Sequence, residues 1–175
     1  MADLSKFESA PKLQLLTELK GARCVMLGSP ASGEHMQPMA PQIDKETLKT
    51  VENGGESVIY FYSDNTSDLG IAAIKNPGAR VMATHISGDY QACIEGALYP
   101  IQNDSALIDR FWNSIVASWY PDGKTDSKML MLKFVPLTAG VWASTGNPLK
   151  FAYETAKANL TDSLPDVGDS KVISA

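Results

Sequence analysis

The stretch FWNSIVASWYPDGKTDSKMLMLKFVPLTAGVW (111–142) contains the end of a helix, a turn and two β-rich segments in direct succession. Apolar side chains recur at helical spacing in its first part, which predicts a helix from Asp104 or Ser105 to Trp119. The residues YPDG then break the helix, because Pro and Gly favour turns. Two strands are predicted after this turn, at residues 128–136 and 138–144.

Further strands are predicted on the N-terminal side of this stretch. Segments rich in β-branched and aromatic residues indicate them at residues 22–29, 57–63, 79–87 and 90–102. The dipeptide Gly88-Asp89 joins the last two and suits a tight hairpin. Segment 34–42 is also extended, but Pro38 and Pro41 cannot donate ladder hydrogen bonds, so we expect it at a sheet edge. Helices are predicted between Ser9 and Gly21, and at residues 65–76 and 148–160.

The order of these elements predicts a mainly β (α+β) fold. Six or seven strands joined largely by hairpins disfavour a regular alternation of strands and helices. A small antiparallel barrel with peripheral helices is favoured, because closure removes exposed strand edges. We expect one domain at residues 1–161. Residues 162–175 mix Asp, Ser, Gly and Pro with few apolar anchors, which predicts a flexible C-terminal tail.

The composition excludes several classes of protein. The 175 residues carry a formal net charge of −5, which disfavours a general nucleic-acid binder, because that class needs a basic surface. No apolar run reaches the ~18 residues of a membrane span. The N-terminal segment MADLSKFESAPK lacks the pattern of a secretory signal. We therefore expect a cytoplasmic protein with no nucleic-acid or membrane partner.

Common catalytic and metal-binding motifs are absent from the sequence. There is no GxSxG, no P-loop and no GxGxxG after a strand. His35 and His85 are the only histidines, and nothing at a suitable spacing adds a third ligand, so we expect no metal site. Cys24 and Cys93 lie in apolar segments, which indicates small core residues rather than a disulfide or a reactive thiol.

The turn at residues 63–68 has two interpretations. It carries hydroxyl side chains from a predicted strand to the start of a predicted helix. Such residues commonly cap a helix N-terminus. The backbone N–H groups of that terminus also favour an anion, so the same turn could hold a phosphate group.

Three segments, in order, resemble the pyridoxamine 5′-phosphate oxidase-like, FMN-binding split barrels, and within them the general stress protein branch. Segment 111–142 is similar to that branch's Trp-rich helix, W-(F/Y)-P-x-G turn and strand pair. Segment 59–82 resembles its F-(F/Y)-(T/S)…helix…N-P…V stretch, and segment 35–42 its S-R-P-M strand. The resemblance covers about residues 10–145. It implies a six- to seven-stranded antiparallel split β-barrel.

The resemblance also implies a homodimer with FMN at the subunit interface. Segment 36–39 and the turn 62–69 would line the site, and aromatic residues of the partner subunit would approach the flavin. The cofactor-binding residues implied in this way are Met36, Gln37, Pro38, Met39, Tyr62, Ser63, Thr66, Ser67, Asp68, Leu69, Trp119, Tyr120 and Trp142.

The sequence departs from the family pattern at two positions. Gln37 stands at the position of an arginine, and Leu69 at the position of a lysine, that help to hold the FMN phosphate. Each charge-assisted hydrogen bond is worth about 1.5–3 kcal/mol, so we expect weaker FMN binding. Gln37 and the hydroxyls of Ser63, Thr66 and Ser67 are neutral donors that could compensate.

Two functions remain open at this point. The resemblance implies a flavin-binding general stress protein, with FMN-dependent oxidoreductase activity on an unknown substrate as the chemistry of that class. No general base or substrate-recognition cluster identifies a reaction, and no second set of cations would hold pyridoxamine phosphate. The alternative is a non-catalytic dimeric stress protein, poor in flavin or free of it, that binds another small ligand. Trp112, Trp119 and Trp142 fit a core role by their positions, whereas the resemblance implies that one or more of Trp119, Tyr120 and Trp142 approaches the flavin.

Overall fold

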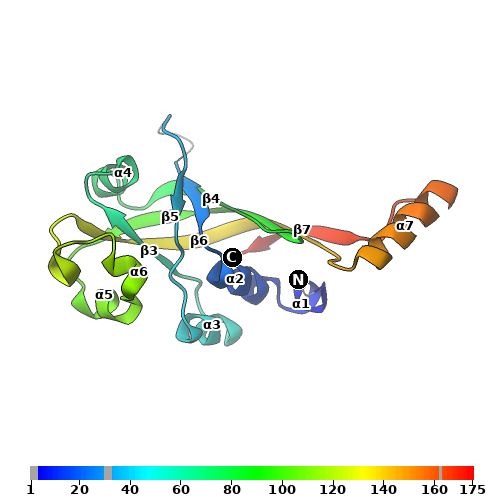
Figure 1. Ribbon diagram of the computed structural model, residues 1–175, viewed down its shortest axis with the longest axis horizontal. Helices are drawn as coiled ribbons and strands as arrows, with labels where there is room; N and C mark the ends of the chain where they lie inside the picture. The colour runs from blue at the N-terminus through cyan, green and yellow to red at the C-terminus, as the bar shows by residue number, and fades with distance from the viewer. Residues whose placement is uncertain (1–3, 30–32, 162) are drawn as a thin grey trace.

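The computed structural model describes residues 4–29, 33–161 and 163–175, in which seven antiparallel strands form one sheet (Figure 1). The strands are β1 (Val25–Gly28), β2 (Gln37–Met39), β3 (Ile59–Asp64), β4 (Ala79–Ile86), β5 (Tyr90–Ile101), β6 (Met129–Ser144) and β7 (Gly168–Ser174). They follow the order β2-β1-β4-β5-β6-β3, with β7 also beside β6. Gln42, just after β2, exchanges backbone hydrogen bonds of 2.7 and 3.3 Å with Tyr60 of β3. The sheet therefore nearly closes, and the predicted antiparallel split barrel is confirmed.

Strand β6 organises this barrel. One edge pairs with β5 along its length, while the other edge pairs first with β3 and then with β7. The two strands predicted at 128–136 and 138–144 are therefore one continuous strand. The register between β5 and β6 shifts at Gly96, where any larger side chain would collide with the ring of Phe134. Such a bulge bends the sheet and so helps it to close.

The described residues also form seven α-helices and one short 3-10 helix, of which α7 projects away from the sheet (Figure 1). They are α1 (Leu4–Ser9), α2 (Pro11–Gly21), α3 (Lys45–Glu52), α4 (Asp68–Lys75), α5 (Ser105–Phe111), α6 (Ser114–Ala117), η1 (Gly123–Thr125) and α7 (Pro148–Thr161). Leu15, Leu16 and Leu19 of α2 are completely buried and pack into the same core as the inward-facing side chains of the strands. In the described parts of the chain, no helix is both long and apolar enough to cross a membrane.

Two helix predictions need correction, and one helix was not predicted. Ser9 ends α1 instead of capping α2. The single helix predicted as far as Trp119 ends at Phe111, because the side-chain oxygen of Asn113 accepts hydrogen bonds from two backbone N–H groups and starts α6. Helix α3, for which no element was predicted, is capped by Asp44, whose carboxylate accepts a hydrogen bond from the N–H of Thr47.

The flexible tail predicted for residues 162–175 is wrong for its last part. Residues Gly168–Ser174 form β7, which pairs with β6 at seven positions. Ile173 packs against the core, and the N–H of Ala175 donates to the carbonyl of Leu137. Strand β3 leaves the second half of one edge of β6 unpaired, and β7 occupies that edge. Residue 162 lies outside the described residues.

Candidate functional site

A small cleft lies where the end of β1, the strand β2 and the first turn of α4 meet; we name it the β1–α4 cleft. Gln37 and Leu69, the two positions that depart from the family pattern, both line it together with Asp68. Leu69 is only 6% exposed and is also part of the core. Glu34 and His35 line the same cleft, although the sequence did not single them out for it. The fold thus brings together residues from two of the three segments that carry the resemblance.

The other predicted residues of segment 36–39 have different environments. Met36 packs against Gly28, where an added Cβ would stand 3.0 Å from the Cα of Met36. Pro38 is exposed on an edge strand, where its missing N–H leaves no gap in the ladder. Met39 is buried in the core. Of these four residues, Gln37 alone is among those that line the β1–α4 cleft.

The turn between β3 and α4 is built around Asp64. The backbone N–H and the hydroxyl of Thr66 both donate to its carboxylate at 2.6 Å, and these hydrogen bonds hold the pKa of Asp64 below its usual range. The hydroxyl of Ser67 donates to the Asp64 carbonyl and accepts from the N–H of Gly70, at 2.7 and 3.1 Å. The Ser63 hydroxyl lies 3.4 Å from that of Ser67. The helix-cap interpretation of this turn is therefore the one that the hydrogen bonds support.

The charges around the β1–α4 cleft do not fit a phosphate dianion. Asp68 and Glu34 line it, Asp64 is held ionised in the adjacent turn, and no Lys or Arg is among the described lining residues. Carboxylates so close would repel a second anion. No group of three or more His, Cys, Asp or Glu among the described residues could hold a metal ion.

Tyr62 and Tyr120 lie in an aromatic cluster on the outer side of β3. The ring of Tyr62 is centred 6.1 Å from that of Tyr120 and 6.3 Å from that of Trp112. The Tyr62 hydroxyl donates to the carbonyl of Ile108 at 2.7 Å, and the Tyr120 hydroxyl donates to the carbonyl of Ser63 at 2.8 Å. Burial raises the pKa of each tyrosine to about 12, so both hydroxyls are protonated at neutral pH. The cluster fixes the turn that precedes α4.

The other two predicted aromatic residues are exposed. Trp119, just after α6, is 77% exposed, and Trp142 on β6 is 47% exposed. Leu130, the β6 partner of Ser63, precedes Trp142 by twelve residues on one strand. That separation is about 40 Å of extended chain. Within one chain Trp142 therefore cannot reach the turn at residues 62–69.

The outer side of the sheet carries a face with several exposed apolar side chains, which we name the apolar sheet face. A row of residues crosses five strands in register, namely Met26, Thr84, Cys93, Gly140 and Val172. Ile86 and Trp142 lie beside this row and are 81% and 47% exposed. The Trp142 ring lies against Gly140, 3.1 Å from where a Cβ would stand. Contiguous apolar faces of this kind are typical of contacts between protein chains.

Comparisons with known proteins give the same fold. The family model described as pyridoxamine 5′-phosphate oxidase like matches residues 11–166. A search of curated proteins found no match. A structure assigned as general stress protein 26 from Jannaschia sp. CCS1 is 27% identical with a TM-score of 0.74, and the match covers 95% of this chain and 99% of that one.

Two structures from Xanthomonas are also similar. The general stress FMN/FAD binding protein of Xanthomonas citri is 30% identical with a TM-score of 0.64, over 77% of this chain and 89% of that one. A general stress family protein of Xanthomonas campestris pv. campestris is 29% identical with a TM-score of 0.65, over 84% and 93%. The split barrel, the match over residues 11–166 and these relatives together establish that the chain belongs to the pyridoxamine 5′-phosphate oxidase-like family, in its general stress protein branch.

Proposed function

We propose that this protein binds a flavin at the interface of a homodimer and holds it through the ring system more than through the phosphate. The observation that carries the proposal is that Gln37 of β2 and Leu69 of α4 meet at the β1–α4 cleft. The resemblance implies that these two positions face the flavin nucleotide. The Xanthomonas citri relative, described as FMN/FAD binding, supports the same class of ligand.

Two features of the single chain favour a site that a second subunit completes. The β1–α4 cleft of one chain encloses about 20 Å³, whereas small-molecule sites commonly measure roughly 300–1,000 Å³. The exposed Trp142 is about 40 Å of strand away from the turn before α4. A partner packed on the apolar sheet face would bring its own Trp142 toward that turn. A flavin bound there would supply the redox chemistry, and the chain would supply position and electrostatics.

A second candidate function is a dimer that binds no flavin. The carboxylate of Asp68 at the cleft favours it, since it opposes the phosphate of FMN. A direct titration separates the two. Protein purified without added flavin is titrated with FMN and with riboflavin, which lacks the phosphate, and flavin fluorescence is measured.

We expect both flavins to bind with dissociation constants within about threefold of each other. FMN binding at least about tenfold tighter than riboflavin would show that the phosphate is recognised, against the ring-based part of the proposal. No binding of either flavin up to about 1 mM would reject the flavin and leave the second candidate.

The homodimer has its own test. Light scattering should give about twice the 18.9 kDa mass of the chain. Trp142→Arg places a charge in the apolar sheet face, and we expect it to shift the protein to monomer at micromolar concentration. Thr50→Arg adds the same charge at an exposed position on α3 and should leave the dimer intact. A wild-type monomer, or equal behaviour of the two variants, would reject this interface.

A further inference from the structure

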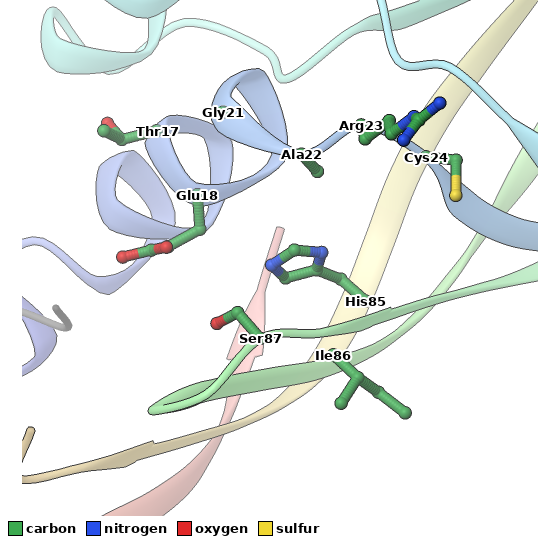
Figure 2. A pocket seen from close by; sticks show the side chains of 9 residues that line it. All are labelled: Thr17, Glu18, Gly21, Ala22, Arg23, Cys24, His85, Ile86 and Ser87. Carbon is green, nitrogen blue, oxygen red and sulfur yellow. The ribbon is translucent and has the colours of Figure 1, made fainter.

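A second pocket lies away from the β1–α4 cleft, between the C-terminal end of α2 and the end of β4 (Figure 2). We name it the His85 pocket. It encloses about 470 Å³, within the range of small-molecule sites. Residues of α2, of the segment before β1 and of β4 line it, among them Glu18, Arg23, Cys24, His85 and Ile86.

The side chain of His85 is the feature that indicates a ligand. The residue is only 6% exposed, and its Nε2 atom is buried without a hydrogen-bond partner in the structure. The hydroxyl of Tyr90, whose ring is centred 6.4 Å away, is also buried and unpartnered. Buried polar atoms are nearly always paired, and an unpaired one in a native fold needs an explanation. Figure 2 shows the imidazole projecting into the space between α2 and β4.

The imidazole of His85 is suited to hydrogen bonding rather than to ion pairing. Burial lowers the pKa of His85, so the ring is neutral near pH 7. A neutral imidazole has one nitrogen that donates and one that accepts. A hydroxyl group can pair with Nε2 whether that nitrogen donates or accepts, because a hydroxyl does both.

The charges on the two sides of His85 give the pocket a polarity. Arg23 is exposed, and no ion-pair partner for it exists among the described residues. Glu18 lies on the other side of the imidazole (Figure 2). An anionic group would therefore be attracted to the Arg23 side and repelled from the Glu18 side. Ala22, Cys24 and Ile86 offer apolar contact between them.

We propose that the His85 pocket is a second ligand site, separate from the flavin cleft, that binds a small hydroxylated organic acid. Arg23 pairs with the carboxylate, and Nε2 of His85 pairs with the hydroxyl. The site does not depend on flavin binding, because the β1–α4 cleft lies at the opposite end of β1.

The test uses 4-hydroxybenzoate as the probe, with benzoate and 4-hydroxybenzamide as analogues that lack the hydroxyl and the charge. Binding to the full-length protein is followed by the NMR shift of the His85 ring nitrogens. We expect a saturable shift below about 10 mM for 4-hydroxybenzoate and at least about tenfold weaker binding for each analogue. No saturable shift would overturn the proposal.

Matched variants distinguish contact from general electrostatics. Arg23→Gln should weaken binding about tenfold or more, whereas Lys20→Gln, which removes an exposed charge from the same helix end outside the pocket, should change it less than about twofold. Equal losses would mean that the probe senses only net charge, against the proposed contact. Both positions are exposed, so neither variant is expected to impair folding.

The two free cysteines give an independent readout. Cys24 lines the pocket and Cys93 does not. The probe should slow alkylation of Cys24 by iodoacetamide and leave that of Cys93 unchanged, as measured by mass spectrometry. Saturating riboflavin should not displace the probe. Displacement would make the pocket part of the flavin site and would overturn its independence.

Discussion

Each end of strand β1 borders a hollow in the protein surface, and the two hollows have opposite characters. At the Gly28 end, the β1–α4 cleft encloses about 20 Å³ and has the buried side chain of Leu69 in its wall. At the Cys24 end, the His85 pocket encloses about 470 Å³ and combines an unpartnered imidazole nitrogen with an exposed guanidinium. The family resemblance pointed to the smaller hollow. A family motif can therefore be present at a hollow whose charges do not suit the family's ligand.

The largest difference between the two hollows should appear when their walls are truncated. Leu69→Ala removes a core side chain and should lower the free energy of unfolding by about 2–4 kcal/mol. Cys24→Ser alters an exposed wall of the His85 pocket and should change the free energy of unfolding by less than about 0.5 kcal/mol. Urea denaturation of both variants gives the comparison. A loss below about 1 kcal/mol for Leu69→Ala would mean that the cleft wall is not part of the core.

The next largest effect concerns the missing charge of the β1–α4 cleft. Leu69 is buried, so a cation is better introduced at the half-buried Gln37. Gln37→Arg combined with Asp68→Asn adds a positive charge and removes a negative one. FMN should bind at least about tenfold tighter, about 1.4 kcal/mol, while riboflavin should gain less than about twofold. Isothermal titration calorimetry measures both. Equal gains for the two flavins would show that these positions do not face the phosphate.

A smaller effect should follow when the buried nitrogen of the His85 pocket is removed. His85→Phe replaces an unpartnered polar group by an apolar ring of similar shape, so the free energy of unfolding should stay level or rise by about 0.5–1 kcal/mol. Binding of 4-hydroxybenzoate should be lost at the same time. Destabilisation by more than about 1 kcal/mol would indicate that the imidazole has a partner within the fold.

The smallest expected effect is the pH dependence of stability. The pKa of His85 is lowered below its ordinary value of 6.5 in the folded state by burial. Between the two pKa values the unfolded chain binds more protons, so wild-type stability decreases as the pH falls below 6.5. His85→Phe lacks this decrease, and its stability relative to wild type should be greater at about pH 5.5 than at about pH 7.5.

Glu18 affects the pH dependence of the free energy of unfolding in the opposite direction from His85. Burial raises the pKa of Glu18 above 4.5 in the folded state. Between the unfolded and the folded pKa of Glu18 the folded chain binds more protons, so the free energy of unfolding decreases as the pH rises through this range. This contribution is common to wild type and His85→Phe and cancels in their difference. A difference that does not change with pH would contradict the assignment of the slope to His85.

Local patterns in the sequence determined much of the fold. The alternating β-branched and aromatic residues of β3, β4 and β5 predicted these strands, and Gly88-Asp89 predicted the hairpin, because period-two burial and turn chemistry are properties of short segments. The hydroxyl residues of the turn before α4 were expected to cap a helix for the same reason, with Thr66 or Ser67 as the cap, and the structure shows that Ser67 is the one. The order of the strands and their hairpin connections also identified the barrel.

Only the tertiary structure decided the features that depend on contacts between distant segments. Residues Gly168–Ser174 form a strand because the second half of β6 offers a free edge, and no local propensity reports that edge. The hydroxyls of the turn before α4 serve Asp64 and the helix cap, so they are not free to hold a phosphate. The His85 pocket arises where α2 crosses the end of β4, and each of its residues taken alone reads as an ordinary helix or strand position. Sequence patterns indicate which face of a helix or strand is buried. Which other segment covers that face, and whether any part of it stays uncovered, depends on the packing of the whole fold.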